Sequence, residues 1–539
     1  MTISRRDLLR RAGAFGVASV VTVVSGCVGN DDDFVDDLPR YEYDGEPGPE
    51  DLFQHGVASG DPLTDSVILW TRVTDPAASG PIEVFVEVAT DPSFERRVAA
   101  TPLVATPDRD YTVKIDLEGL APATTYYYRF FALGRESVTG RTRTAAEGPL
   151  DRLRFVFCSC SSLAHGYFHA YRRISERADL DFVVHLGDYI YEYASGQYGA
   201  VRTYEPEHEI VTLEDYRMRY SQYRRDPDLQ AVHQQHPFIT VWDDHESAND
   251  SWREGAENHG SDQGDWETRK QASIQAYMEW LPIREGAQGV IYRTLPFGDL
   301  VDLVMLDTRL VGRDEPATNV NDSESIDDPA RTLLGSEQEA WLSDRLRTST
   351  TRWQIVGQQV MMGQLQLVPG TPLNLDQWDG YPAARERFFQ AIEAAGLDNV
   401  VVLTGDIHSS WAIDLSYDPF DPEEYDRDTG AGAVAVELVT PAISSPGLPT
   451  NISIDVPHIK WVDTRERGYV VVDVTHERVQ ADWFHVEDVT STSGSAERFA
   501  NAFTVASGAR HLVPAASPVP PRPDAPELAP PAPRDLAPA

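Results

Sequence analysis

The sequence predicts an α/β protein in which a large α/β domain is preceded by a small all-β sandwich of the fibronectin or immunoglobulin type. Between residues 51 and 148, short runs that alternate apolar and polar residues are separated by turns containing Gly or Pro, a pattern typical of antiparallel strands. Between residues 149 and 513, apolar runs alternate with segments of helical periodicity, which indicates a sheet with crossover helices. Several of these apolar runs end in residue types that commonly bind metals in proteins, such as Cys, Asp and His.

The length and the net charge of the chain indicate how many domains it can form and argue against one class of function. The chain has 539 residues, enough for two or more domains, and a formal net charge of −40. Nearly all positive charge is arginine, because the only lysines are Lys114, Lys270 and Lys460. This balance argues against a nucleic-acid-binding surface, which needs basic residues to neutralise phosphates. It favours attraction of cations, although an acidic proteome or a salty habitat would explain it equally well.

Residues 1–27 are predicted to be a targeting segment. Residues 4–9, SRRDLL, carry the paired arginines of a twin-arginine signal. The apolar stretch that follows, residues 12–24, is shorter than the ~20 residues that span a bilayer. Residues 24–27, VSGC, resemble a lipoprotein processing box with Cys27 as the lipidated residue; an ordinary cleavage site is the alternative. We therefore expect export by the twin-arginine translocase to the periplasm or cell surface, with a membrane contact only through Cys27.

Residues 28–50 are acidic and rich in turn formers, and we expect them to be a linker. The sandwich domain follows at residues 51–148, with strands expected at 67–70, 82–88, 111–115 and 126–131. Residues 119–126, GLAPATTY, resemble the strand-crossing corner of fibronectin-type domains, in which the Tyr126 hydroxyl caps the backbone. No set of catalytic side chains occurs in this region, so we expect it to have a packing role.

The α/β domain is expected at residues 149–513. Helical patterns occur at 167–177, 213–223 and 268–280, and apolar runs typical of buried strands occur at 153–158, 182–186, 238–242, 300–306, 353–360, 399–403 and 469–474. Residues 514–539 are rich in Pro and Ala, and we expect this tail to be disordered or polyproline-like.

Two thiols remain after removal of Cys27, at Cys158 and Cys160. Residues two apart on a strand face the same side at a spacing of roughly 6.6–6.8 Å, which is the edge of disulfide geometry. A free thiol in an exported protein binds a metal or packs as a small hydrophobic group. We expect one thiol of each kind.

Three further motifs follow apolar runs. In the first, Asp188 can bridge two cations with its two oxygens. Tyr191, three residues later in the chain, can place its phenol oxygen in the same site. A phenolate ligand favours Fe³⁺. The alternative is that Asp188 caps the next helix and Tyr191 packs in the core. In the second motif, Asp406 and His408 can present a carboxylate and an imidazole to adjacent metals.

The third motif is the run DDHE at residues 243–246, with Asn249 shortly after it. Asp244 and Asn249 offer oxygen ligands that suit Ca²⁺. His245 could be a metal ligand, or a general acid or phosphate donor, and we expect Glu246 to orient His245 or another ligand. Arg309 lies at another strand end, where its guanidinium would clamp phosphate oxygens or pair with one of the many acids.

Together these motifs resemble the calcineurin-like metallophosphoesterases, and within them the alkaline phosphatase D (PhoD) family. The superfamily order is an Asp motif, GDxxY, GNH[DE] and GHxH. The equivalents in this sequence are Cys160, GDYIY at 187–191, DDHE at 243–246 and GDIH at 405–408. A Cys in the first motif and an Asp in the last are marks of the PhoD type. Further similar stretches are HGVASGDP at 55–62, HGYF at 165–168 and GAENH at 255–259.

The resemblance implies a four-layer α/β/β/α sandwich and a site that holds Fe³⁺ and Ca²⁺. Transferred residue by residue, Fe³⁺ would be bound by Cys160, Asp188, Tyr191 and His408. Calcium would be bound by Asp188 as a bridge and by Asp244, Asn249 and Asp406. Cys160 is chosen over Cys158 because it precedes HGYF at the family's spacing. Catalytic roles would fall to Asp188, His245 and Arg309.

The implied activity is that of an exported alkaline phosphatase, a monomer, that hydrolyses phosphomonoesters and phosphodiesters with a hydroxide activated by the cations. One alternative is a phosphodiesterase similar to phospholipase D, since the same kind of site can accept lipid diesters. Another is a non-catalytic surface lipoprotein whose sandwich domain binds a partner. The sequence leaves the natural substrate and the number of calcium ions open.

Overall fold

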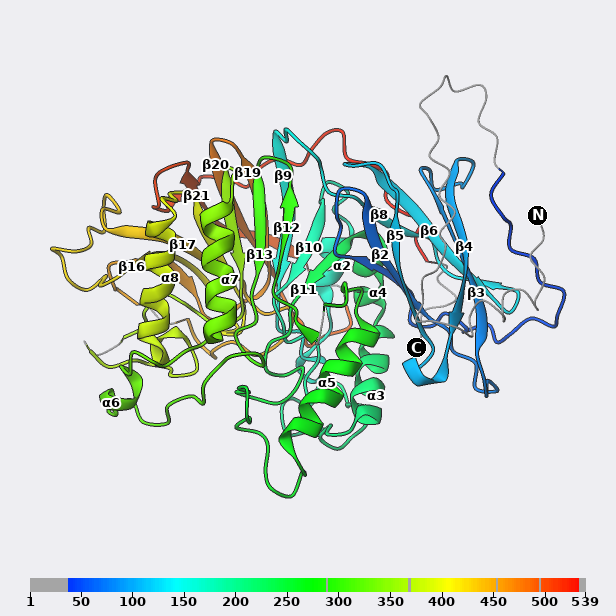
Figure 1. The fold of residues 1–539 in the computed structure, drawn as a ribbon, viewed down its shortest axis with the longest axis horizontal. Coiled ribbons are helices and arrows are strands. Elements are labelled where there is room, and N and C mark those ends of the chain that lie inside the picture. The colour runs from blue at the N-terminus through cyan, green and yellow to red at the C-terminus, as the bar shows by residue number, and fades with distance from the viewer. Residues whose placement is uncertain (1–36, 287–288, 367–369, 452–453, 494–495, 533–539) are drawn as a thin grey trace.

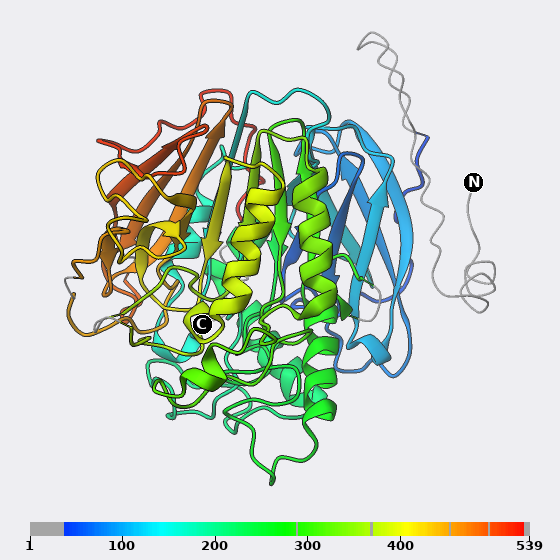
Figure 2. The ribbon, with the colours of Figure 1, turned by 60° about the vertical axis from the view of Figure 1, so that its left-hand side comes forward.

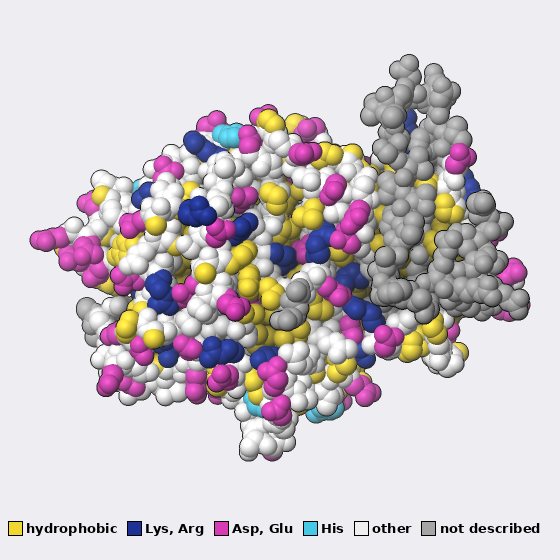
Figure 3. Space-filling view, viewed as in Figure 1, with side chains coloured by type: hydrophobic (Ala, Val, Ile, Leu, Met, Phe, Trp, Pro, Cys, Tyr) yellow, Lys and Arg dark blue, Asp and Glu magenta, His cyan; other side chains and the backbone are white. Residues whose placement is uncertain are grey.

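The computed structural model describes residues 37–286, 289–366, 370–451, 454–493 and 496–532. The predicted targeting segment, with Cys27, and most of the predicted linker lie outside these residues. Within the described ranges, no helix has both the length and the apolar character needed to cross a membrane. Figure 3 shows acidic side chains spread over the visible face, with basic side chains between them.

A ten-stranded sheet runs through both predicted domains. In spatial order it contains β22 (Val513–Pro514), β21 (Glu497–Ala506), β20 (Arg478–Val486), β19 (Arg467–Thr475), β9 (Arg152–Cys158), β10 (Phe182–His185), β11 (Pro237–Thr240), β1 (Val57–Gly60), β2 (Ser66–Arg72) and β5 (Thr112–Glu118). Strands β9, β10, β11 and β1 are parallel neighbours. All but the first residue of β9 are buried, and its last four residues, 155–158, form the apolar run expected of a strand that is covered on both faces.

The domain boundary expected near residue 148 does not divide this sheet. Strand β1 precedes that position but pairs in parallel with β11 of the α/β domain. The last residue of β1, Gly60, allows this strand to approach β11. A Cβ atom at Gly60 would lie 2.6 Å from the Phe238 carbonyl oxygen of β11 and 2.2 Å from the Pro282 carbonyl oxygen. The two predicted domains therefore share a continuous sheet.

A seven-stranded sheet packs against the ten-stranded one. It contains β12 (Arg293–Phe297), β13 (Val301–Met305), β14 (Trp353–Gly357), β15 (Val400–Thr404), β17 (Ala433–Val439), β16 (Ser410–Ser416) and β18 (Ile459–Asp463). Strands β13, β14, β15 and β17 are parallel. Buried side chains of both sheets, such as Phe155 and Val183 from one and Leu303 and Ile355 from the other, form one core.

Helices cover the outer faces of these two sheets. Helices α7 (Gly335–Thr348) and α8 (Pro382–Ala394) lie on the seven-stranded sheet (Figures 1 and 2) and share a core with it. Helices α2 (His169–Ser175) and α4 (Pro227–Gln235) contact the ten-stranded sheet, and α3 (Leu213–Arg224) packs on α5 (Trp266–Trp280). Short helices occupy Pro107–Arg109, Leu163–His165, Ser323–Ile326 and Trp378–Gly380. The four-layer α/β/β/α arrangement is thus confirmed.

The N-terminal sandwich is completed by a third sheet. It contains β4 (Arg97–Ala105), β3 (Ile82–Ala89), β6 (Thr125–Ala132) and β7 (Arg135–Glu136), and β8 (Gly140–Arg143) also pairs with β6. Side chains of this sheet, such as Val84, pack against Val67 and Leu69 of β2. The Tyr126 hydroxyl accepts a hydrogen bond from the Ala121 N–H at 2.9 Å, which confirms the predicted tyrosine corner.

The expected disorder of the C-terminal tail does not extend over residues 514–532. This segment, which we call the C-terminal strap, contacts both predicted domains. The Arg522 guanidinium lies 3.0 Å from an Asp181 carboxylate oxygen, and the Tyr127 hydroxyl donates to the Glu527 carbonyl at 2.6 Å. Proline has no N–H but keeps its carbonyl acceptor, so Pro-rich backbone can still accept hydrogen bonds from the surface it crosses.

Candidate metal centre

The carboxyl ends of strands from both sheets face a common site. Cys160 follows β9, Asp188 follows β10, Asp243 and Asp244 follow β11, and Asp406 follows β15. Parallel strands of packed α/β sheets place such residues in one crevice. The sequence pattern of apolar runs that end in polar side chains therefore becomes a single cluster of side chains.

The backbone at these strand ends is strained. Cys160, Asp188, Asp406 and His408 have φ angles of 63°, 56°, 62° and 55°, in the left-handed region that non-glycine residues rarely adopt. Each such residue costs about 1–3 kcal/mol and persists only where the surroundings hold it, most often at functional sites. At Gly187, a Cβ atom would lie 2.4 Å from the Asp243 backbone nitrogen, so glycine lets the two loops approach each other.

One group of side chains, which we call the Cys160 group, consists of Cys160, Asp188, Tyr191 and His408. The Cys160 sulfur, an Asp188 oxygen and a His408 ring nitrogen lie within 4.8 Å of one another. The Tyr191 hydroxyl donates to Asp188 Oδ2 at 2.8 Å and lies 3.2 Å from His408 Nε2. His408 Nδ1 lies 3.0 Å from the Pro446 carbonyl, so that nitrogen carries the proton and leaves Nε2 as the electron-pair donor.

Burial favours the protonated forms of two members of the Cys160 group, the thiol and the phenol. Burial raises the pKa of the Cys160 thiol and of the Tyr191 phenol well above their ordinary values, and the charge of Asp188 raises both further. Asp188 Oδ1 is buried and has no hydrogen-bond partner among the described residues. An unpaired buried carboxylate oxygen is costly, and a cation would both satisfy it and favour the ionised thiolate and phenolate. The donor set therefore fits a metal ion.

Cys158 lies apart from this group. It is the last residue of β9, is fully buried in the core, and its sulfur is 3.8 Å from the Val184 carbonyl oxygen. Both cysteines are free. The expectation that one thiol joins the polar cluster and the other packs as a hydrophobic group agrees with this arrangement.

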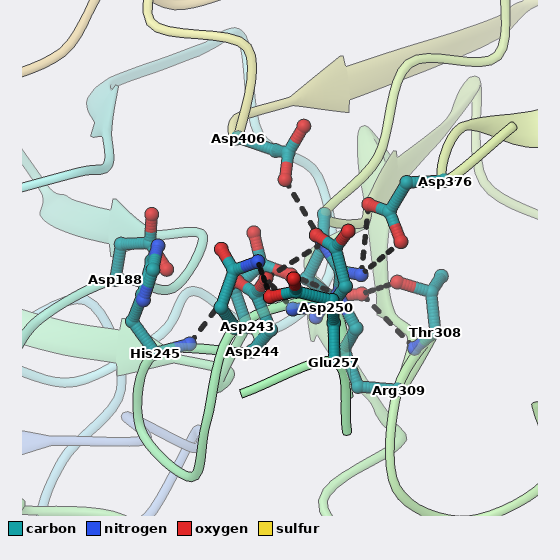
Figure 4. A network of polar contacts seen from close by, with 12 residues as sticks. Asp188, Asp243, Asp244, His245, Asp250, Glu257, Thr308, Arg309, Asp376 and Asp406 are labelled. Atoms are coloured by element: carbon teal, nitrogen blue, oxygen red, sulfur yellow. Dashed lines mark hydrogen bonds and ion pairs between the residues drawn. The ribbon is translucent and has the colours of Figure 1, made fainter. Parts of the chain in front are cut away.

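A second group, which we call the carboxylate group, consists of Asp243, Asp244, Asp376 and Asp406. Oxygens of Asp243, Asp244 and Asp406 lie within 4.8 Å of one another. The fully buried Arg309 guanidinium lies among these acids (Figure 4): Nε is 2.5 Å from Asp243, Nη1 is 2.8 Å from Asp376, and Nη2 is 2.9 Å from Asp406. This guanidinium neutralises part of the charge that the carboxylates bring together.

The structure shows one of the two alternatives that the sequence left for Arg309, a phosphate clamp or an ion pair with acids. Each of the three guanidinium nitrogens donates to a carboxylate, so the ion pairs are present. Asp376, which anchors Arg309 and also Arg313, was not predicted, because no apolar strand run precedes it.

The acidic members of the predicted calcium set lie in overlapping clusters. Asp188 and Asp244 share a cluster with His245, and Asp244 shares another with Asp406. The Asn249 side-chain nitrogen donates to Glu257 at 3.2 Å, and its backbone N–H donates to Glu192 at 2.8 Å. Neither contact uses Asn249 Oδ1, the atom that would bind calcium.

His245 is held by Glu192, a residue that the sequence did not single out. His245 Nδ1 lies 2.7 Å from Glu192 Oε2, and the imidazole stacks on the Tyr191 ring at 4.2 Å. Burial alone would lower the pKa of His245, but the charges of Glu192, Asp188 and Asp244 raise it well above the ordinary value. Glu192 and His245 therefore form a buried ion pair that leaves Nε2 free. The sequence feature that could have indicated this ion pair is the position of Glu192, an acid directly after the GDxxY motif.

Glu246 has the second of its two predicted roles, which is to orient a candidate ligand other than His245. Its carboxylate accepts hydrogen bonds from the backbone N–H groups of Asp188, Tyr189 and Asp243 at 3.0, 2.5 and 2.7 Å. It therefore joins the loop after β10 to the loop after β11 and does not orient His245. This contact fixes Asp188 relative to Asp243.

Known proteins resemble the chain over most of its length. The family model described as PhoD-like phosphatase matches residues 155–483, and the model described as PhoD-like phosphatase, N-terminal domain, matches residues 42–146. The alkaline phosphatase D of Bacillus subtilis (strain 168) is 36% identical over 512 residues, which cover 89% of this chain and 84% of that protein. A solved structure described as "Structure of PhoD" superposes with a TM-score of 0.80 at 35% identity, covering 89% of this chain and 94% of the other.

Proposed function

We infer the function from one premise: the chain belongs to the PhoD-like phosphatase family, and it is a phosphoric ester hydrolase. We propose that it is an exported, metal-dependent alkaline phosphatase that hydrolyses phosphomonoesters and phosphodiesters. The observation that carries the metal dependence is the partnerless, buried Asp188 Oδ1 among the thiol, phenol and imidazole of the Cys160 group.

We further propose Fe³⁺ and Ca²⁺ as the cations. Cys160, Asp188, Tyr191 and His408 would hold iron, because a thiolate and a phenolate both favour a ferric ion over calcium. Asp244 and Asp406 offer the oxygen donors that calcium prefers, and Asp188 belongs to a cluster with each set, which suits a bridge. When bound, the cations would neutralise phosphate charge and make a water molecule more acidic.

His245 is proposed to protonate the leaving oxygen. Glu192 holds Nδ1 at 2.7 Å, so the ring is fixed and the proton on Nε2 is directed away from Glu192. The stacking on Tyr191 places this nitrogen beside the Cys160 group. A positioned general acid of this kind typically contributes about 10²–10⁴-fold to a rate.

Elemental analysis combined with a substrate panel tests this proposal. Purified protein should contain iron and calcium, and it should release nitrophenol from both 4-nitrophenyl phosphate and bis(4-nitrophenyl) phosphate. A preference for phosphatidylcholine over both would favour the phosphodiesterase similar to phospholipase D. Protein loaded with both metals that cleaves none of the three would favour the non-catalytic lipoprotein and contradict the proposal. Light scattering on the same sample checks the expected monomer.

Export is proposed from the sequence alone. Arg5 and Arg6 are the paired arginines, and Cys27 is the proposed lipid attachment site. Replacing both arginines by lysine should retain the protein inside the cell, whereas Cys27→Ser should leave export intact and release the protein from the membrane fraction. Unchanged fractionation of both variants would contradict the proposed route.

A further inference from the structure

Arg309 is buried and its guanidinium is paired with acids. A phosphate ester carries negative charge, and the centre that would receive it contains several carboxylates. A cationic side chain that pairs with none of those carboxylates is better placed than Arg309 to donate hydrogen bonds to the phosphate oxygens. A phosphate-binding side chain of this kind would belong to the active site of the proposed phosphatase, so its assignment rests on the proposed function.

Arg467, the first residue of β19, has the required properties. Its Nε donates to the Ser445 carbonyl at 2.9 Å, and its Nη1 donates to the Arg465 carbonyl. No carboxylate forms an ion pair with it within the described part of the chain. It is half-buried, and a guanidinium keeps its charge even when burial lowers its pKa. In a protein with 86 acidic residues, this is a cation held in place by backbone carbonyls alone.

Ser445 connects Arg467 to the Cys160 group. The Ser445 carbonyl accepts a hydrogen bond from the guanidinium, and the Ser445 hydroxyl lies 2.6 Å from the Tyr191 hydroxyl and 2.9 Å from the Cys160 carbonyl, either of which can accept its one proton. One residue thus contacts both the arginine and two members of the proposed metal centre. The guanidinium therefore lies at the edge of that centre.

Tyr198 lies on the same edge. Its ring stacks on the Tyr191 ring at 5.5 Å and meets the His165 ring at 4.4 Å. Within the described residues its hydroxyl has no hydrogen-bond partner, and the side chain is half-buried. Burial raises the pKa of this phenol, and the charge of Asp188 raises it further. The Tyr198 hydroxyl is therefore a neutral O–H donor beside the Cys160 group.

The segment that carries Tyr198 is fixed from both sides. The buried Arg219 guanidinium donates to the carbonyls of Tyr191 and Tyr193. On the other side, the Val201 N–H donates to the Ala164 carbonyl at 2.7 Å, and a Cβ atom at Gly199 would lie 2.6 Å from that carbonyl oxygen. The phenol is thus held in place before a substrate arrives, which lowers the entropic cost of binding.

We propose that Arg467 and Tyr198 form an anion-binding edge of the active site and donate hydrogen bonds to the non-bridging oxygens of the phosphate ester. In this role both are catalytic residues that touch substrate and its product, inorganic phosphate. The guanidinium contributes charge and two N–H groups of Nη2, and the phenol contributes one O–H group.

The test compares Arg467→Gln, Arg467→Lys and Tyr198→Phe with two matched controls. Arg510→Gln removes a half-buried arginine that also donates to a backbone carbonyl, that of Leu397. Tyr417→Phe removes a half-buried phenol that donates to Glu393. Each protein is assayed for KM and kcat with 4-nitrophenyl phosphate, for competitive inhibition by inorganic phosphate, for phosphate binding by calorimetry, and for iron and calcium content.

Arg467→Gln should raise KM, the phosphate inhibition constant and the phosphate Kd about tenfold to a hundredfold, the usual size for a lost hydrogen bond to a charged group. Tyr198→Phe should raise them by about tenfold, and Arg467→Lys should be intermediate, because it keeps the charge but not the planar fork. Metal content and both controls should match the wild type.

Phosphate inhibition and binding within twofold of the wild type in folded Arg467→Gln and Tyr198→Phe would overturn the inference. If Arg467→Gln does not fold, Arg467→Lys and Tyr198→Phe decide the matter in the same way. A wild-type protein that hydrolyses no ester would instead contradict the proposed function, so the two failures are distinguishable.

Discussion

The Cys160 group and the carboxylate group lie side by side, yet they are stabilised in different ways. In the Cys160 group, neutral donors surround one carboxylate, and Asp188 Oδ1 has no partner among the described residues. In the carboxylate group, Arg309 forms ion pairs with four acids, Asp243, Asp244, Asp376 and Asp406. Arg309 thus supplies a positive charge to the carboxylate group, whereas within the described residues no Arg or Lys forms an ion pair with Asp188.

The difference shows how a folded chain can prepare two dissimilar sites next to each other. Buried carboxylates repel each other strongly unless a positive charge lies between them. The carboxylate group needs Arg309 for that reason, whereas the Cys160 group needs only the loss of two protons to become a set of anionic ligands. We therefore expect the two groups to respond differently to mutation, to pH and to added metal.

Asp188→Asn should have the largest effect on activity. Asp188 shares one cluster with Cys160 and His408 and another with Asp244 and His245. We expect kcat/KM to fall by on the order of 10⁴-fold, the size of loss seen when one member of a cooperating set is removed. Steady-state assays and elemental analysis check this result. Activity within tenfold of the wild type would show that neither group depends on the shared carboxylate.

Arg309→Met should destabilise the metal-free protein by about 3–5 kcal/mol, because it leaves buried carboxylates without their counter-charge. Added calcium should restore part of that loss by binding the same carboxylates. Urea unfolding with and without chelator measures both effects. Arg385→Met is the matched control, since Arg385 is buried against the Asp379 carboxylate and its loss should show no calcium rescue. Equal calcium responses in both variants would contradict the assigned role of Arg309.

Cys160→Ser should weaken iron binding by about 100-fold or more, because it removes a proposed ligand. Removal of a residue that only hydrogen-bonds to a ligand costs about 10–100-fold in metal affinity. The calcium content should stay unchanged. Cys158→Ser should retain both metals and lose about 1–3 kcal/mol of stability, because it buries a hydroxyl in an apolar core. Elemental analysis and thermal unfolding of the two variants provide the comparison. Iron loss in Cys158→Ser alone would reverse the assignment of the thiols.

Asp406 of the carboxylate group should contribute to the pH dependence of the stability of the metal-free protein. Burial raises the pKa of Asp406 to about 6, with Arg309 opposing the rise and Asp376 and Asp244 adding to it. In the unfolded chain this pKa is about 3.9. Between about pH 4 and 6 the unfolded state releases a proton that the folded state keeps, so the free energy of unfolding falls by about 2–3 kcal/mol as the pH rises.

Asp406→Asn should remove this loss, and urea unfolding of both proteins at pH 4 and pH 7 measures it. The thiol and the phenol of the Cys160 group should contribute nothing in that window, because both stay protonated. Identical pH profiles for the wild type and Asp406→Asn would show that Asp406 does not titrate as described.

Much of the fold followed from local patterns. The strand expected at 399–403 is found at Val400–Thr404, and the helix expected at 213–223 is found at Leu213–Arg224. Helix α4 was not predicted, although Asp226 and Pro227 form a standard start signal that the structure uses: the Asp226 carboxylate accepts from the Leu229 N–H. The strap at 514–532 could not be predicted, because its composition is that of a disordered segment and its order depends on distant partners such as Asp181.

The sequence by itself determined which chemical groups stand at the strand ends, because apolar periodicity and ligand type are local properties. The resemblance of its motifs to the PhoD family implied that Cys160, Asp188, Tyr191 and His408 share one site and that Cys160, not Cys158, belongs to it. Only the tertiary structure decided the charge partners: Arg309 with the carboxylate group, Glu192 with His245, and Glu246 with the backbone of two loops. The energy of each of these pairs depends on a distance and a burial that arise when strands and loops far apart in the chain pack together.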